Sequence, residues 1–238
     1  MKKVFFISKI SFNNIEAEYQ LTFEKDHLFA NINGGLWLID TGAPVSFGNV
    51  ECLLFCKNNF PINKNYYGFT AETVSQYLGV YCTGLLGVDL LNSFDIIFHA
   101  EEKTLFASSD VIPFNGKNEP LDDIFGIPII NVNIKNMPYR MIFDTGAQIS
   151  YFQSGTINHF PTAGIFNDFH LTIGRYETET YNVPMMFFNK QYIVRCGTLP
   201  EPIAMTIRTA KTTGIVGCEI LRECVAGYFP RRRLLAVL

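Results

Sequence analysis

The sequence carries little charge, and neither sign dominates. Lys, Arg, Asp and Glu make up 17% of the 238 residues, and the formal net charge at pH 7 is −3. Such a chain has no electrostatic attraction for nucleic acid or for anionic membranes, so neither is expected as a partner. The one basic cluster, Arg231–Arg233, is expected to form a solvated turn at a hairpin tip.

Metal-binding patterns are missing as well. The six cysteines include no pair of Cys-x-x-Cys motifs, and no histidine lies near them at zinc-ligand spacing. No metal and no cofactor are therefore expected. The thiols are expected to be free and mostly buried, with a disulfide between Cys218 and Cys224 as the alternative.

Signals for secretion or membrane insertion are absent too. Only four apolar residues stand between the basic start and Lys9, too few for the core of a signal peptide, and no later apolar run is long enough to span a membrane. No Asn-x-Ser/Thr glycosylation site occurs. These absences favour a cytoplasmic, bacterial setting over a secreted one.

What the chain does contain is the tetrapeptide Asp-Thr-Gly-Ala twice, at residues 40–43 and 144–147, a separation of 144 − 40 = 104 residues. A given tetrapeptide arises by chance at roughly 10⁻⁵ per position, so two copies indicate an internal duplication. An apolar run precedes each copy, at residues 36–39 and 141–143. Each run predicts a buried strand that delivers an acidic side chain to a turn.

A second pair of related segments follows in the same order. Thr83–Leu91 contains Gly-Leu-Leu-Gly and Thr213–Leu221 contains Gly-Ile-Val-Gly, with their second glycines 217 − 87 = 130 residues apart. The second half therefore carries 130 − 104 = 26 additional residues, which are expected in loops. Two lobes are predicted, residues 1–112 and 113–238, joined through a polar stretch rich in turn-forming residues.

Strands are predicted through most of both halves. Tyr19, Leu21 and Phe23 alternate with polar residues, as in a half-exposed strand, and apolar runs flank the turn residues that follow. The fold class is expected to be all-β, with closed or orthogonally packed sheets. Brief helical turns are expected after Gly87 and Gly217.

Two carboxylates brought together by such a duplication can catalyse hydrolysis. At about 3 Å apart they cannot both ionise, so they share one proton. One member can then take a proton from a water molecule while the other hydrogen-bonds the carbonyl under attack. Gly42 and Gly146 would let the backbone approach the acids, and Thr41 and Thr145 would link the two loops through hydroxyl bonds to the opposite backbone.

These residues resemble those of the retroviral-type aspartic proteases. That family carries one Leu/Ile-Asp-Thr-Gly-Ala and one Ile-Ile-Gly-x-x-Leu-Leu segment per subunit and works as a homodimer. Leu38–Ala43 with Leu85–Leu91 matches this pattern, and so does Ile142–Ala147 with Ile215–Leu221. The sequence is therefore similar to two such subunits fused in one chain, as in bacterial retropepsin-like proteins.

The resemblance implies two β-barrel lobes related by a pseudo-twofold axis, in a monomer with an internal pseudo-dimer. It implies an aspartic endopeptidase whose substrate is an extended polypeptide, with Asp40 and Asp144 as the catalytic dyad. Ala43 and Ala147 would border the substrate. Pepsins often have serine at these two positions, and the missing hydroxyls predict activity at mildly acidic rather than strongly acidic pH.

Proteases of this family also close β-hairpin flaps over the substrate. In the first half the resemblance favours residues 65–69 as the flap tip, with Tyr67 and Gly68 over the substrate. In the second half Gly164 and Gly174 are competing candidates. An ordinary hairpin turn is the alternative at each of these positions.

Two other functions are compatible with the same motifs. The chain could be a peptide-binding module that keeps the fold without activity, although the retention of both Asp-Thr-Gly copies argues against this. It could also be a latent protease, closed by its own flap or by the additional residues of the second half until a partner or a processing event opens it.

Overall fold

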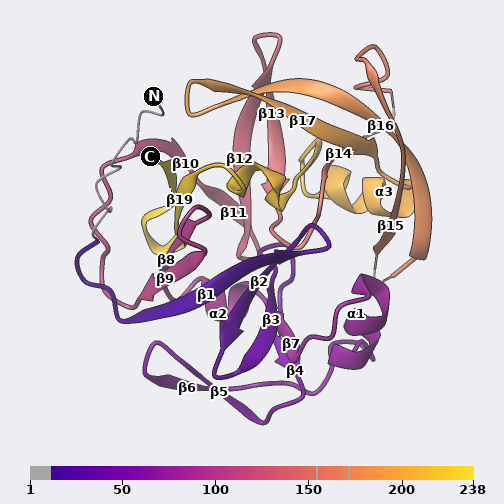
Figure 1. Ribbon diagram of the computed structural model, residues 1–238. Coiled ribbons are helices and arrows are strands. Elements are labelled where there is room, and N and C mark those ends of the chain that lie inside the picture. Colours follow the sequence, from indigo (N-terminus) through magenta and orange to yellow (C-terminus); the bar gives the residue numbers. More distant parts are fainter. Residues whose placement is uncertain (1–11, 154, 171) are drawn as a thin grey trace, which may run out of the picture.

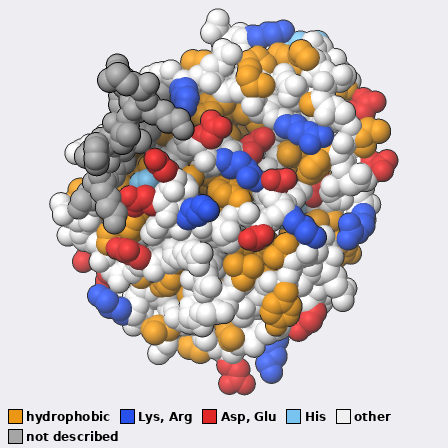
Figure 2. All heavy atoms as spheres, viewed as in Figure 1, with side chains coloured by type: hydrophobic (Ala, Val, Ile, Leu, Met, Phe, Trp, Pro, Cys, Tyr) orange, Lys and Arg blue, Asp and Glu red, His pale blue; other side chains and the backbone are white. Residues whose placement is uncertain are grey.

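A computed structural model describes residues 12–153, 155–170 and 172–238, and most of its regular structure is β-strand, as expected (Figure 1). Residues 1–11, on which the signal-peptide prediction depends, lie outside the described part. Among the described residues, no helix is both long and apolar enough to cross a membrane. Acidic and basic side chains are interspersed on the face shown in Figure 2.

The first half begins with an antiparallel meander that ends at the first Asp-Thr-Gly. In the β2–β3 turn, Asn33 and Gly34 have φ angles of 52° and 79°, as a two-residue type I′ hairpin turn requires. β3 then pairs in parallel with β7, which carries the Gly-Leu-Leu segment. The strands of this region are β1 (Ala17–Glu24), β2 (His27–Ile32), β3 (Gly35–Ile39), β4 (Phe47–Gly48) and β7 (Gly84–Leu86).

The second half repeats this arrangement. β12 and β13 form a hairpin whose turn residues, Lys135 and Asn136, have φ angles of 49° and 65°. β13 ends at the second Asp-Thr-Gly and pairs in parallel with β18. These strands belong to an eight-stranded sheet that includes β11 (Asp122–Ile124), β12 (Ile127–Ile134), β13 (Met137–Phe143), β14 (Ser150–Phe152) and β18 (Gly214–Val216).

A ten-stranded sheet joins the two halves, in the order β10-β20-β19-β8-β9-β1-β2-β3-β7-β4. Its central junction is the antiparallel pair β8–β19, in which His99 lies opposite Val225. One sheet therefore crosses the predicted boundary after residue 112. The strands around the junction are β8 (Asp95–His99), β9 (Thr104–Ser108), β10 (Lys117–Pro120), β19 (Val225–Phe229) and β20 (Leu234–Val237).

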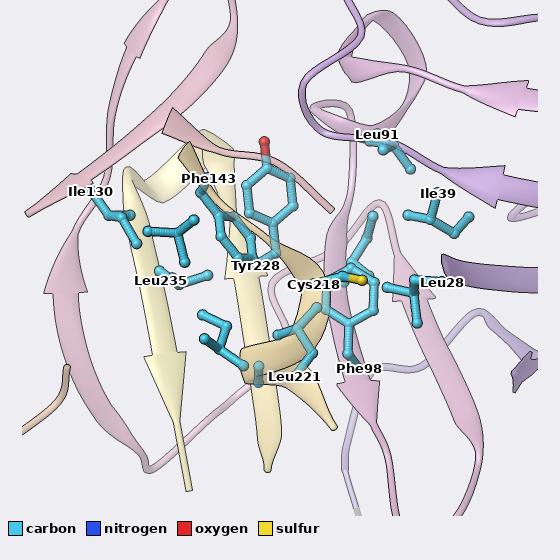
Figure 3. Close-up of a cluster of buried hydrophobic side chains, with 14 of the residues drawn as sticks. Leu28, Ile39, Leu91, Phe98, Ile130, Phe143, Cys218, Leu221, Tyr228 and Leu235 are labelled. Carbon is cyan, nitrogen blue, oxygen red and sulfur yellow. The ribbon is translucent and has the colours of Figure 1, made fainter. Parts of the chain in front are cut away.

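The main hydrophobic core also contains side chains from both halves (Figure 3). Leu28 and Phe98 of the first half belong to the same buried cluster as Phe143, Tyr228 and Leu235 of the second, and each is at most 1% exposed. Because burial of apolar surface is the main stabilising term, neither half has a complete core without the other.

Helical turns follow both glycines, as expected: α2 (Val88–Leu91) and the 3₁₀ helix η1 (Cys218–Leu221). Two longer helices, α1 (Ala71–Leu78) and α3 (Glu201–Thr209), were not expected. In α1 the Thr70 hydroxyl accepts the Thr73 backbone N–H, and the helix ends at a left-handed glycine. The helices are short, and each buries only three side chains, so the apolar spacing was too brief to distinguish them from loops.

The additional residues of the second half form strands, so the prediction that they lie in loops is wrong. α1 and α3 begin 201 − 71 = 130 residues apart. Since the Asp-Thr-Gly copies are only 104 residues apart, the additional residues lie between the second copy and α3. The corresponding interval of the first half holds only the short hairpin of β5 (Cys52–Phe55) and β6 (Asn58–Pro61). The second half instead has β15 (Thr162–His170), β16 (Gly174–Phe187) and β17 (Lys190–Thr198), paired in that order.

All six cysteines are free thiols, so Cys218 and Cys224 form no disulfide. Four of the six are buried, in agreement with the expectation for thiols that serve as small apolar side chains.

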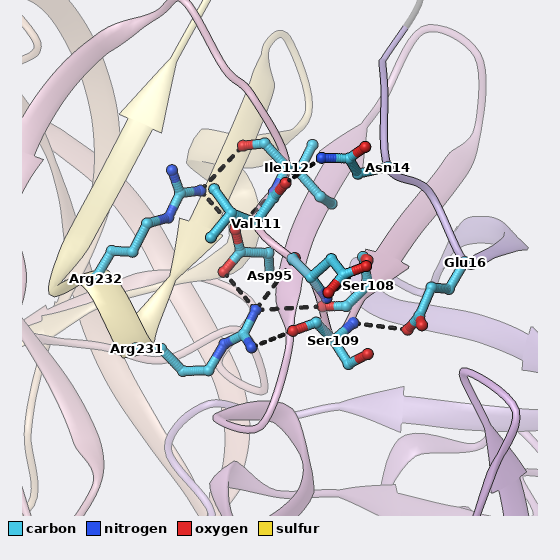
Figure 4. A network of polar contacts seen from close by, with 10 residues as sticks. Asn14, Glu16, Asp95, Ser108, Ser109, Val111, Ile112, Arg231 and Arg232 are labelled. Carbon is cyan, nitrogen blue, oxygen red and sulfur yellow. Dashed lines mark hydrogen bonds and ion pairs between the residues drawn. The ribbon is translucent and has the colours of Figure 1, made fainter.

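The basic cluster forms the turn of the β19–β20 hairpin, as expected, but two of its three arginines also bind a buried acid (Figure 4). Arg231 and Arg232 follow β19 and both bind the carboxylate of Asp95, at 3.0 and 2.6 Å. Asp95 is fully buried at the start of β8 and also accepts the backbone N–H of Ile112. Arg233, which is more exposed, pairs with Asp122. Sequence proximity gave no sign of this pairing, since the partners are more than 100 residues apart.

Candidate active site

The structure brings Asp40 and Asp144 together. Each follows a strand whose end is held by its parallel neighbour: the Asp40 N–H donates to Leu86 at 3.0 Å and the Asp144 N–H to Val216 at 2.9 Å. The two carboxyl groups hydrogen-bond each other. The Asp-Thr-Gly turns thus form one paired site between residues 104 positions apart in the chain.

The glycines of the two turns make this approach possible. A Cβ atom added to Gly42 would lie 2.4 Å from Cγ of Asp144, and one added to Gly146 would lie 2.4 Å from Cγ of Asp40. Any side chain at either position would overlap the opposite acid. The glycine N–H groups also each donate at 2.9 Å to the acid of their own loop.

Burial and mutual repulsion hold a proton on the pair. Burial raises the pKa of both carboxyls, and for Asp40 the neighbouring charge of Asp144 raises the pKa further. Hydrogen bonds from backbone N–H groups lower the pKa of both carboxyls, because they stabilise the ionised form. Because the groups share a proton, the two titration steps belong to the pair rather than to either residue.

The threonines bind the two loops to each other reciprocally. The Thr41 hydroxyl donates to the Phe143 carbonyl at 2.7 Å and accepts the Thr145 N–H at 3.0 Å. The Thr145 hydroxyl donates to the Ile39 carbonyl at 2.7 Å and accepts the Thr41 N–H at 3.0 Å. Both threonines are fully buried, so these four bonds hold the acids at close range without competition from water.

A second matched pair of contacts lies behind the loops. The Ser46 hydroxyl donates to Asp89 at 2.6 Å and accepts the Gly87 N–H at 2.9 Å. In the other half, the Ser150 hydroxyl contacts Glu219 at 3.2 Å and accepts the Gly217 N–H at 3.1 Å. Sequence reasoning missed these residues. The signal was present, because the two serines stand at the 104-residue offset and the two acids at the 130-residue offset.

Glu219 makes stability depend on pH. Burial raises its pKa from 4.5 to about 7, so between these values the unfolded chain loses a proton that the folded chain keeps. The free energy of unfolding should therefore fall as pH rises through this window, by up to about 3 kcal/mol from this group. We expect Glu219→Gln to flatten the dependence, as measured by urea unfolding at pH 4.5, 5.5 and 7. An equally steep dependence in the variant would assign the effect to other groups.

The dyad opens into a cleft of about 350 Å³ that both halves line. Its walls are largely apolar and aromatic, with ionisable side chains at a few positions. Both alanines of the repeated motif line it. Side chains from the first half include Leu38, Phe47, Tyr66, Tyr67, Phe69, Val74 and Leu85, and those from the second half include Tyr151, Asp168, His170, Tyr176, Leu199, Ile203 and Ile215.

The candidate flap residues divide between the cleft and its surroundings. Tyr67 lines the cleft but is 85% exposed. Gly68 adopts a φ of 86° in the same turn without lining the cleft. Gly174 ends the turn between β15 and β16, beside the cleft-lining residues His170 and Thr172; Leu171, in the same turn, lies outside the described residues.

Gly164 occupies a different place from Gly174. It has a φ of 83° at a bulge in β15 and does not line the cleft. Of the two glycines, Gly174 is therefore the one at the hairpin end that reaches the site. The added strands carry this hairpin toward α1 (Figure 1), where Phe169 stacks on Tyr77 with ring centroids 4.8 Å apart and planes 4° apart.

His27 was not singled out from the sequence, yet it lies in the cleft. Its Nδ1–H donates to the carbonyl of Gly146 at 3.1 Å. Burial lowers the pKa of His27 to about 4, so the ring is neutral above that pH and serves as a hydrogen-bond donor to the second Asp-Thr-Gly loop.

The sequence matches no protein-family model, and no curated protein matches it. The functional argument therefore depends on the geometry of the site.

Proposed function

We propose that this protein is an aspartic endopeptidase built as two retropepsin-like lobes in one chain. The observation that carries the proposal is the pair of buried, mutually hydrogen-bonded carboxyls whose loops are linked by reciprocal threonine bonds. A structural role alone does not account for this arrangement, because placing two carboxyls together in a buried site is energetically unfavourable.

The proposed reaction uses water as the nucleophile. The ionised member of the pair takes a proton from a water molecule as the water oxygen attacks the carbonyl carbon of the peptide bond. The protonated member hydrogen-bonds the carbonyl oxygen and stabilises the charge that develops there. The tetrahedral intermediate collapses when the C–N bond breaks and the departing nitrogen receives a proton from the pair.

The cleft suits an extended polypeptide. It runs between the two halves and presents apolar and aromatic side chains on both sides of the dyad. A peptide in extended conformation points successive side chains in opposite directions, so both walls could bind substrate side chains. Tyr67 and residues of the β15–β16 hairpin line the cleft, and in the proposed complex they would cover such a peptide.

Incubation with an unfolded protein across pH 3 to 7, followed by mass spectrometry of the fragments, tests the proposal. We expect internal cleavage by the wild type and none by the matched variant Asp40→Asn. If the wild type binds peptides without cleaving them at any pH in this range, the chain is a binding module with the same cleft, and the proposed activity is wrong.

The pH optimum should be mildly acidic rather than strongly acidic. Burial keeps the pKa of the dyad high, and alanines stand where a serine hydroxyl could stabilise the ionised acid. Activity requires one carboxyl ionised and the other protonated, so kcat/KM should have a bell-shaped dependence on pH. An optimum near about pH 2, as in pepsin-like dyads, would contradict this expectation.

A further inference from the structure

A third carboxylate faces the cleft. Asp168, on β15, lines it together with Tyr151 and Tyr176. The Tyr151 hydroxyl donates to the Asp168 carboxylate, and Tyr176 lies beside it in the cleft. The backbone N–H of Phe169 donates to the same group at 2.7 Å. These neutral donors orient the carboxylate, but no Lys or Arg pairs with it in the described part of the chain.

Among the described residues, no positively charged side chain lines the cleft. Neither Lys nor Arg is among its lining residues, and its two histidines, His27 and His170, have pKa values lowered by burial. The dyad contributes one further negative charge when it is active. Burial raises the pKa of Asp168, and a cation that entered the cleft beside this carboxyl would favour its ionised form, because water screens charges poorly there.

The cleft has one wall from each half of the chain, and the Asp168 carboxylate lies on the second-half wall only. Three positions of the first half have counterparts in the second, and both members of each pair line the cleft. The pairs are Phe47 and Tyr151, 104 residues apart, Phe69 and Leu199, 130 apart, and Leu85 and Ile215, also 130 apart.

The first-half wall built from these positions is apolar. The second-half wall differs by the hydroxyl of Tyr151 and by Asp168, which comes from the inserted strands. The insertion has thus placed an acid in one of two otherwise corresponding subsites.

We propose, on the basis of the endopeptidase function above, that Asp168 is a specificity residue that selects a lysine or arginine side chain next to the scissile bond. The aliphatic stem of that side chain would pack against Leu199 and Ile203, and its charged end would reach the Asp168 carboxylate. The opposite subsite would take an apolar or aromatic side chain. Substrates would therefore be polypeptides with a basic residue on one side of the cleaved bond and an apolar residue on the other.

The test uses two peptides identical except for lysine or methionine at the position identified from the cleavage sites. We expect the wild type to cleave the lysine peptide with a kcat/KM about 10- to 100-fold higher, the range of one hydrogen bond to a charged group. In Asp168→Asn this ratio should fall toward one, and Asp168→Glu should retain part of it. The control Glu177→Gln removes the same charge from an exposed position on β16, outside the cleft, and should leave the ratio unchanged.

The outcomes separate this inference from the proposed function. Cleavage of both peptides by the wild type at equal rates would overturn the role of Asp168 while leaving the endopeptidase intact. A wild-type preference for lysine that persists in a folded Asp168→Asn variant would assign the selection to another residue. Absence of any cleavage, by any variant, would remove the proposed function itself.

Discussion

Asp40→Asn and Asp144→Asn should each lower kcat/KM for peptide cleavage by at least about 10³-fold, because each removes one half of a proton-sharing pair. An asparagine cannot take a proton from the attacking water, and it cannot return one to the departing nitrogen. The measurement is the initial rate on a peptide whose cleavage has been established with the wild type. The double variant should be no slower than either single one, since residues that act as a unit have non-additive effects.

Both variants should remain folded, so a loss of activity can be assigned to the missing carboxyl rather than to unfolding. Burial raises the pKa of both carboxyls, so the folded state disfavours their ionised forms and a neutral amide of the same shape costs little. The free energy of unfolding at neutral pH should be unchanged or higher than in the wild type. Peptidase activity that persists in either folded variant would show that the pair is not the catalytic centre.

Asp95→Ala should destabilise the fold by about 1 to 3 kcal/mol, because it leaves the buried N–H of Ile112 without its acceptor. Asp95 is fully buried and binds two guanidinium groups and a backbone N–H. Its loss would leave Arg231 and Arg232 without their shared anion at the junction of the halves. Urea unfolding, with the midpoint and slope compared with those of the wild type, measures the change.

The matched control is Asp122→Ala, which also removes an acid that binds two arginines. Asp122 pairs with Arg140 and Arg233, but its side chain is 49% exposed. Water can replace the lost contacts there, so we expect a change of about 1 kcal/mol or less. Equal losses in the two variants would mean that burial of Asp95 adds nothing to its ion pairs.

Repetition made the centre of the site predictable from sequence. Two copies of Asp-Thr-Gly-Ala indicated which acids correspond, and the structure brings those acids together through Thr41 and Thr145. Residues without a repeated counterpart were not predictable in this way. Asp168 lies in strands that the first half lacks, and nothing in the sequence around it marks the side chain as part of the cleft.

Contacts between distant segments escaped prediction for a different reason. The Arg231–Arg233 cluster has the composition of a solvated turn, and only the pairing of β8 with β19 places it over the buried Asp95. The helices α1 and α3 were missed because their buried faces are too short for a periodic pattern to stand out.

The β8–β19 junction has a consequence for the order of folding. Val225 pairs with His99 across 225 − 99 = 126 residues, so this contact cannot form until all the residues between them have been synthesised. Pairings of such long range close late and slow the folding reaction. A nascent chain would carry both Asp-Thr-Gly loops well before it carried β19, the strand that joins the first-half and second-half strands of the ten-stranded sheet. The ten-stranded sheet would then be completed only after both Asp-Thr-Gly loops have been synthesised.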